Sequence, residues 1–270
     1  MNIQYGKKID NKERTAVRGV LIKDNLIGVI KVDKYDCYIF PGGGVDEGEN
    51  LEEALIRELQ EEAGFEVIVK EHLLTTETAE WKFTHINHFY LCDIIGDKEM
   101  SHTEEEIDLG IHFEWVSIDE LYMYYLNLET DNRFGSQNAE VQKSIRSRGF
   151  LLMSLLNKKL GLELEELWLG KSVNMVFDRP SNGERVNYGY IEGIYSLDGD
   201  EVDCYYLDVL EPLKEAQGRV IAVVKRSDDV EDKLVVSNKR FRVEEIAELI
   251  NFNEQYFDSE IIMEEYDGDN

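Results

Sequence analysis

The sequence has few residues that would cross-link the chain or anchor it in a membrane. Its three cysteines, Cys37, Cys92 and Cys204, are widely separated and odd in number. Such a set predicts free thiols in a reducing cytoplasm rather than a disulfide framework. Residues 1–8 lack an apolar signal core, and no apolar stretch is long enough to cross a bilayer. We therefore expect a cytoplasmic protein without a membrane partner.

Basic residues are also scarce. The 270 residues include 29 Lys and Arg against 57 Asp and Glu, which gives a formal net charge of −28. A chain with this negative charge repels nucleic-acid backbones and anionic membrane surfaces. We therefore expect neither as a partner. A small phosphorylated substrate is repelled too, unless metal ions bridge it. The charge is therefore consistent with metal-dependent phosphate chemistry.

One acidic segment carries most of the chemical information. It matches the pattern G-x5-E-x7-R-E-U-x-E-E-x-G-U without a gap, where U is a bulky aliphatic or aromatic residue. The fixed positions are Gly43, Glu49, Arg57, Glu58, Leu59, Glu61, Glu62, Gly64 and Phe65.

The residues around this segment predict a strand, a glycine loop and a helix. The apolar run 38–40 ends at Pro41 and three glycines, the pattern of a strand that enters a tight loop. Asn50, with Glu53 three residues later, predicts a capping-box start for the helix, and Gly64 predicts its end. One buried stripe of this helix consists of Leu51, Leu55 and Leu59.

The glutamates of this helix predict a metal site. Glu58, Glu61 and Glu62 stand at i, i+3 and i+4, so their carboxylates share one face. Neighbouring carboxylates repel one another, and a hard cation such as Mg²⁺ or Mn²⁺ removes that conflict. Arg57 is placed to orient one glutamate through a bidentate ion pair. The alternative is a solvated acidic helix face.

The complete pattern resembles the Nudix box, and residues 1–128 as a whole resemble a Nudix hydrolase domain. The resemblance implies an α/β/α sandwich around a mixed sheet, with metal-assisted cleavage of a diphosphate linkage. It implies metal ligation by Glu61 and Glu62, a ligand or general-base role for Glu58, orientation by Arg57 and a carbonyl ligand near Gly43.

The same resemblance implies two supporting roles. Glu49 would anchor the glycine loop. A further base or substrate contact often comes from a later loop in this family, and Glu105 in the run 104–106 is the candidate; a solvated charge run is the alternative reading.

The other predicted elements of this part are strands. Residues 18–31 predict a hairpin that turns at Asp24–Asn25, residues 81–95 predict a strand, and residues 115–121 predict a strand followed by a helix. His85 and His88 lie on opposite faces of the predicted strand, which favours ordinary strand residues over metal ligands.

Residues 129–165 predict a helical connector that Gly149 interrupts and Gly161 ends. Its basic residues, Arg148 among them, either reach toward a substrate phosphate or balance neighbouring acids. Residues 266–270 are an acidic tail.

Residues 166–265 predict a small β-barrel with a final helix over 243–257, so the chain as a whole belongs to the α+β class. The expected turns lie at 181–183, 198–200 and 237–238.

A second phosphate signature lies in the predicted barrel. Residues 198–204 match D-x-D-[PE]-U-D-x, and together with 187–191 and 228–234 they resemble soluble inorganic pyrophosphatases in order and spacing. The resemblance implies that aspartates bind Mg²⁺ and that two further residues contact phosphate. The implied metal ligands are Asp198, Asp200 and Asp203, and the implied phosphate contacts are Tyr188 and Lys233.

Much of that family's phosphate-binding half has no counterpart here, so a structural or ligand-sensing module is the alternative for the barrel. For the whole chain, the sequence predicts a Mg²⁺-dependent hydrolase of a nucleoside di- or triphosphate, whose pyrophosphate product the barrel would hydrolyse. The alternatives are a nucleotide-sugar or dinucleotide hydrolase with a non-catalytic barrel, and a non-enzymatic nucleotide-binding regulator. The oligomeric state stays open, a homodimer included.

Overall fold

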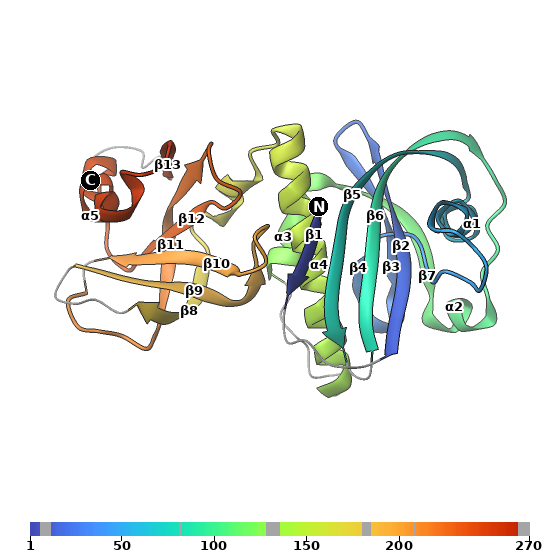
Figure 1. Ribbon diagram of the computed structural model, residues 1–270, viewed down its shortest axis with the longest axis horizontal. Coiled ribbons are helices and arrows are strands. Elements are labelled where there is room, and N and C mark those ends of the chain that lie inside the picture. Colours follow the sequence, from blue (N-terminus) through green and yellow to red (C-terminus); the bar gives the residue numbers. More distant parts are fainter. Residues whose placement is uncertain (6–11, 81–82, 128–135, 180–184, 208, 264–270) are drawn as a thin grey trace. The chain divides into compact units, whose positions relative to one another are not determined.

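The computed structural model describes residues 1–5, 12–80, 83–127, 136–179, 185–207 and 209–263. They form two compact units, Met1–Met153 and Ser154–Asn270, each with its own sheet (Figure 1). The chain is therefore of mixed α and β composition, as predicted. No helix in the described ranges is long and apolar enough to span a bilayer. The three cysteines are free and buried.

A seven-stranded mixed sheet forms the centre of the first unit. Its order is β1-β5-β6-β2-β3-β4, and β7 pairs with β3. β1 runs parallel to β5 and β2 parallel to β6, whereas the other pairs are antiparallel. The strands are β1 (Asn2–Tyr5), β2 (Lys12–Lys23), β3 (Leu26–Val32), β4 (Cys37–Ile39), β5 (Phe65–Glu80), β6 (Phe83–Asp97) and β7 (Ile111–Ser117).

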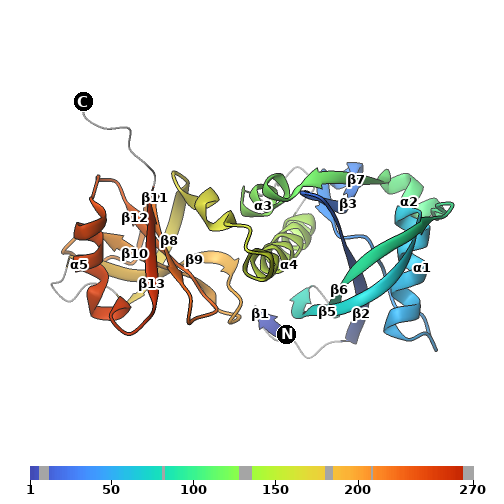
Figure 2. The same cartoon turned by 90° about the horizontal axis from the view of Figure 1, so that it is seen from above.

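Helices cover both faces of this sheet (Figures 1 and 2). α1 packs on one face, while α3 and the first part of α4 lie on the other. The helices are α1 (Leu51–Ala63), α2 (Glu104–Leu109), α3 (Ile118–Asn127) and α4 (Ser136–Leu160), with a 3-10 turn η1 at Asp33–Tyr35. The layered arrangement that the sequence predicted for residues 1–128 is present.

The predicted hairpin is confirmed, because β2 and β3 turn at Asp24, whose φ is 56°. The strand predicted over 81–95 is β6. The long strand β5 was not predicted, and the reason lies in its pairing with β6. That pairing contains three register shifts, which break the alternation of buried and exposed residues that identifies a strand.

The predicted interruption of the connector at Gly149 is wrong, because α4 continues through it. A Cβ at this position would lie 2.4 Å from the ring of Tyr125, so glycine lets α3 and α4 approach closely. The residues of α4 up to Met153 pack in the first unit and the rest of the helix in the second. The predicted boundary at 128 therefore differs from the structure, which divides the chain inside α4.

The second unit contains a closed ring of five strands. β12, β10, β9, β8 and β11 pair in that order, and β11 pairs again with β12, while β13 extends the sheet from β11. A barrel was predicted here. The elements are η3 (Leu164–Trp168), β8 (Ser172–Arg179), β9 (Val186–Tyr195), β10 (Glu201–Leu207), β11 (Glu215–Arg226), β12 (Lys233–Ser237), α5 (Val243–Glu254) and β13 (Ser259–Met263). The expected turn at 181–183 and the tail at 266–270 lie outside the described residues.

The close approach at Gly149 predicts the effect of one added methyl group. In an exposed helix, Gly→Ala stabilises by about 1 kcal/mol. Gly149→Ala instead lowers the free energy of unfolding by about 1–3 kcal/mol, because the methyl group overlaps the Tyr125 ring. Urea unfolding measures the change. Lys143→Ala, at an exposed position of the same helix, is the control and stays within about 0.5 kcal/mol of wild type; an equally stable Gly149→Ala protein would contradict the packing.

Candidate active site

The glycine loop between β4 and α1 is held against the edge of β2. The amide of Gly19 donates to the carbonyl of Pro41 at 2.8 Å, and the amide of Val17 donates to Gly43 O at 3.0 Å. Side chains are excluded from the loop. A Cβ on Gly42, whose φ is +130°, would lie 2.2 Å from Val17 O, and one on Gly43 would lie 2.4 Å from the carboxylate of Glu58. Glycine at positions 42 and 43 therefore lets the loop backbone lie directly against β2 and against the carboxylate of Glu58.

Arg57 connects this loop to α1. Its Nε and Nη2 atoms donate to the two carboxylate oxygens of Glu49, each at 2.9 Å. Nη2 also donates to Gly44 O at 3.1 Å, and Nη1 donates to Glu58 at 2.8 Å and to Glu61 at 3.2 Å. The predicted bidentate pair thus exists, and its acceptor is Glu49.

The helix itself forms as predicted. Asn50 accepts from the amides of Glu52 and Glu53, Glu53 closes the capping box, and Gly64 ends the helix with a φ of 72°. Leu55 and Leu59 are fully buried against the sheet.

Two of the three predicted metal ligands are buried. The Glu62 carboxylate accepts from the amide of Gly42 at 2.7 Å, and burial raises its pKa to about 7 against the opposing charge of Arg18. Burial also raises the pKa of Glu58, which Arg57 opposes. Glu61 is half-buried. The helix therefore carries two carboxylates in surroundings that disfavour their charged forms.

The carboxylates are not gathered around one point. In the described part of the chain, no three His, Cys, Asp or Glu side chains are close enough together to hold a metal ion. Glu105 is exposed in α2, and Glu106 is the member of that run whose charge raises the pKa of Glu62. The structure thus points to Glu106 as the acidic neighbour that sequence reasoning missed.

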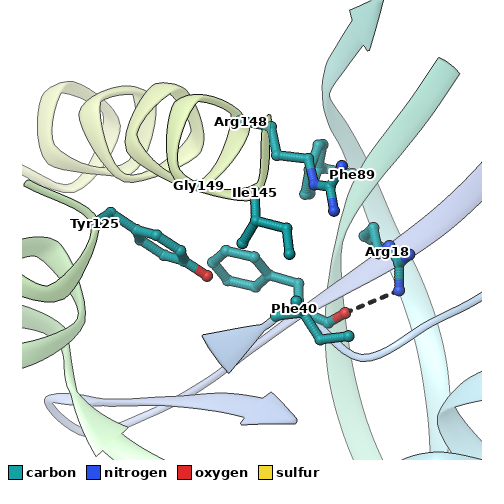
Figure 3. Close-up of a pocket in the computed structure, with 8 residues that line it drawn as sticks. Arg18, Phe40, Phe89, Tyr125, Ile145, Arg148 and Gly149 are labelled. Atoms are coloured by element: carbon teal, nitrogen blue, oxygen red, sulfur yellow. Dashed lines mark hydrogen bonds between the residues drawn. The ribbon is translucent and has the colours of Figure 1, made fainter. Parts of the chain in front are cut away.

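A narrow pocket lies behind the loop on the α4 side of the sheet (Figure 3). Arg18 donates to the carbonyls of Phe40, at 3.3 Å, and Gly42. Burial and the charge of Arg148 lower the pKa of Arg18 to about 10. The remaining lining residues are Ile39, Phe89, Tyr125, Ile145 and Gly149. The sequence analysis predicted no role for Arg18. Its position could have been noticed, because it is a charged residue within an apolar strand segment.

In the second unit, two of the three predicted metal ligands are held in other contacts, and the third, Asp200, is exposed. Asp198 accepts from Ser196 Oγ at 2.7 Å and from the amide of Asp200 at 2.9 Å, so it stabilises its own turn. The Asp203 carboxylate accepts from the hydroxyl of Tyr188 and pairs with Lys233. These aspartates do not fit a metal ion in this arrangement.

Tyr188 and Lys233, the predicted phosphate contacts, do lie together, with Asp203 between them. Sequence reasoning assigned no role to Glu231, which is buried, pairs with Lys233 and accepts from the amide of Asp203 at 3.0 Å. Although burial opposes it, Glu231 and Asp203 raise the pKa of Lys233. The Lys233 ammonium thus lies between the two carboxylates and pairs with both.

Known proteins identify the first part of the chain. The family model described as NUDIX domain matches residues 12–136, which include the glycine loop, α1 with its glutamates, and α2. These residues are a Nudix domain. The match takes in less than half of the chain, and the barrel lies outside it.

Nucleoside triphosphatase NudI of Escherichia coli (strain SE11) and of Shigella flexneri are relatives, each 29% identical over 158 residues. The alignment covers 52% of this chain and 99% of each relative. Similar solved structures include the E. coli ORF135 protein, with 23% identity and a TM-score of 0.35 over 44% of this chain and 84% of that one. A UDP-X diphosphatase has 17% identity and a TM-score of 0.36, over 53% and 65%.

The hydrogen bonds of Arg57 predict that a lysine at this position, although it has the same charge, cannot take over the role of the guanidinium. Arg57→Lys keeps the charge but loses the bidentate pair with Glu49, so the free energy of unfolding falls by about 1–3 kcal/mol. Chemical denaturation measures this. Glu52→Gln, an exposed acid on the same helix, is the matched control and has little effect. A lysine variant as stable as the control would show that the network does not hold the loop.

His85 predicts a loss of stability in acid. Burial and the charges of Arg148, Arg14 and Arg18 lower its pKa from 6.5 to about 4. Between these values the unfolded chain binds a proton that the folded chain does not, so stability falls as the pH decreases from about 6.5 to 4. Because the ring is half-exposed, solvent screening reduces the loss to about 1 kcal/mol.

Denaturation at several pH values, compared between wild type and His85→Gln, measures this difference. The stability of His85→Gln falls less between pH 6.5 and 4 than that of wild type. The control His112→Gln, at an exposed position, shows the same fall as wild type. Titration of His85 near its ordinary pKa by NMR would contradict the burial and charge argument.

Proposed function

We propose that the Nudix domain hydrolyses the diphosphate linkage of a nucleoside triphosphate-type substrate with Mg²⁺ or Mn²⁺. Nudix hydrolases generally use such ions and act on small phosphorylated substrates. The observation that carries the proposal is the pair of buried carboxylates, Glu58 and Glu62, held against the backbone of a glycine loop. The relatives that are nucleoside triphosphatases support the substrate class.

The donor types suit a hard divalent cation, although the described carboxylates would have to turn toward one another to share it. Glu58, Glu61 and Glu62 supply carboxylate oxygens on adjacent turns of α1, and the carbonyl of Gly43 keeps one lone pair beyond its bond to Val17. Burial raises the pKa of Glu58 and Glu62, and the positive charge of a bound cation would lower both pKa values again. When bound, it would polarise the phosphate oxygens and lower the pKa of a water.

The residues of the chain have separate roles in this proposal. Arg57 orients Glu58 and Glu61 while it anchors the loop through Glu49. Glu58 lies against Gly43 and has a pKa that burial raises, so it would be the residue that accepts the proton of an attacking water. Arg18 lies behind the loop and stabilises negative charge there.

For the barrel, the structure favours the alternative to pyrophosphate hydrolysis. Tyr188 and Lys233 lie together, which supports contact with an anion, but Asp203 and Glu231 already pair with Lys233. We therefore propose hydrolysis for the Nudix domain and a non-catalytic, structural or ligand-sensing role for the barrel. Release of phosphate from added pyrophosphate and Mg²⁺ by the full chain would overturn this part.

Replacing a carboxylate tests the first part. Glu61→Gln and Glu62→Gln each lower kcat by at least about a hundredfold against nucleoside triphosphates with Mg²⁺, because a metal ligand is lost while the side-chain shape is kept. Phosphorus NMR identifies the products, and Glu52→Gln is the control that retains activity. Unchanged turnover in both glutamine variants would remove the assignment of this site.

A further inference from the structure

The pocket behind the glycine loop is lined by two arginines and by no acid. Arg18 of β2 and Arg148 of α4 form part of its wall, and the other six residues that line it carry no charge. Figure 3 shows the Arg148 side chain extending from α4 toward the strand that carries Arg18. Two cations that share a narrow pocket repel each other, so the arrangement favours an anion between them.

Arg18 can donate further hydrogen bonds. A guanidinium group has five N–H donors. The bonds of Arg18 to the carbonyls of Phe40, at 3.3 Å, and of Gly42 both start from Nη1. Among the residues that the structure describes, none accepts from Nε or Nη2, so three N–H groups of a side chain at the pocket remain for a ligand.

The acids that act on Arg18 lie outside the pocket. Glu62 and Glu58 attract its charge, but both belong to α1, and neither lines the pocket. On the pocket side the neighbouring charges are positive: burial and the charge of Arg148 lower the pKa of Arg18, and burial and the charges of both arginines lower the pKa of His85. The surroundings of the pocket therefore attract an anion and repel a cation.

The size of the pocket limits the ligand to a single atom. The volume that the centre of a ligand atom can occupy is about 10 Å³, close to the minimum for one water molecule. A chloride ion is slightly larger than water, and it fits when the half-exposed Arg148 side chain shifts outward. Sulfate and phosphate, which have several heavy atoms, do not fit.

We propose that this pocket binds one monatomic anion, chloride under ordinary conditions, between the guanidinium groups of Arg18 and Arg148. The remaining N–H groups of Arg18 donate to the ion, and the charge of Arg148 stabilises it from the α4 side. Because Arg18 also holds the carbonyls of Phe40 and Gly42, the ion connects α4 to the glycine loop. The site goes beyond the proposed hydrolysis and does not depend on it, since the ion binds without a substrate.

Thermal unfolding of the full chain in two sodium salts of equal ionic strength tests the site. Gluconate is too large to enter the pocket, so the Tm is higher in sodium chloride than in sodium gluconate. At a chloride concentration about tenfold above its Kd, the expected difference is about 2–4 °C. Equal Tm values of wild type in the two salts would overturn the proposal.

Variants of Arg148 show whether the effect comes from this pocket. Arg148→Gln removes one of the two charges and loses the chloride-dependent rise in Tm, whereas Arg148→Lys, which keeps the charge, retains part of it. Lys143→Gln, at an exposed position of the same helix, is the matched control and keeps the whole rise. A rise in Arg148→Gln equal to that in the control would place the bound chloride elsewhere and contradict the assignment.

Two measurements on the wild-type chain do not depend on how the variants fold. The chloride NMR line broadens when the ion exchanges with the protein, and bromide narrows it by competition while phosphate does not. Equal competition by phosphate would show that the pocket takes an oxyanion and would refute the single-atom limit. Diffraction near the bromine absorption edge, from crystals grown in sodium bromide, locates the ion: a peak between Arg18 and Arg148 supports the site, and bromide peaks at other positions alone refute it.

Discussion

The guanidinium of Arg57 makes the arrangement of the first unit possible. It joins Glu49, the carbonyl of Gly44 and the glutamates of α1, so that one side chain sets the distance between loop and helix. Without this cation, the same helix would carry acids that repel one another next to a loop with no side chains of its own. Leu55 and Leu59 hold the helix to the sheet, but they do not determine where its carboxylates point.

Charge is distributed unevenly in this acidic chain. Arg18 and Arg148 lie on the α4 side of the sheet, behind the glycine loop, while Glu58 and Glu62 lie on its α1 side. The net charge of −28 indicated metal-dependent chemistry, but it could not show that positive charge gathers on one face.

Local signals predicted the local structure well. Asn50, Glu53 and Gly64 define α1 through contacts between residues close in sequence, which is why a motif sufficed to find them. Gly149 was misread because its close neighbour, Tyr125, lies 24 positions earlier in the chain, and no periodicity shows such a contact. The two buried polar neighbours Asn87 and Thr76 could not be predicted either, because their pairing depends on the register of β5 and β6.

The two units show why similar acidic motifs do not imply the same chemistry. In the Nudix domain, Arg57 pairs with Glu49, Glu58 and Glu61, while the Glu62 carboxylate has the amide of Gly42 as its hydrogen-bond partner and the charge of Arg18 opposite it. In the barrel, the ammonium of Lys233 lies between Asp203 and Glu231 and pairs with both. Breaking a buried ion pair leaves an uncompensated charge, so any cation that binds at Asp203 and Glu231 would first have to displace Lys233. Similar acidic motifs therefore differ in chemistry according to which of their carboxylates a basic side chain already holds.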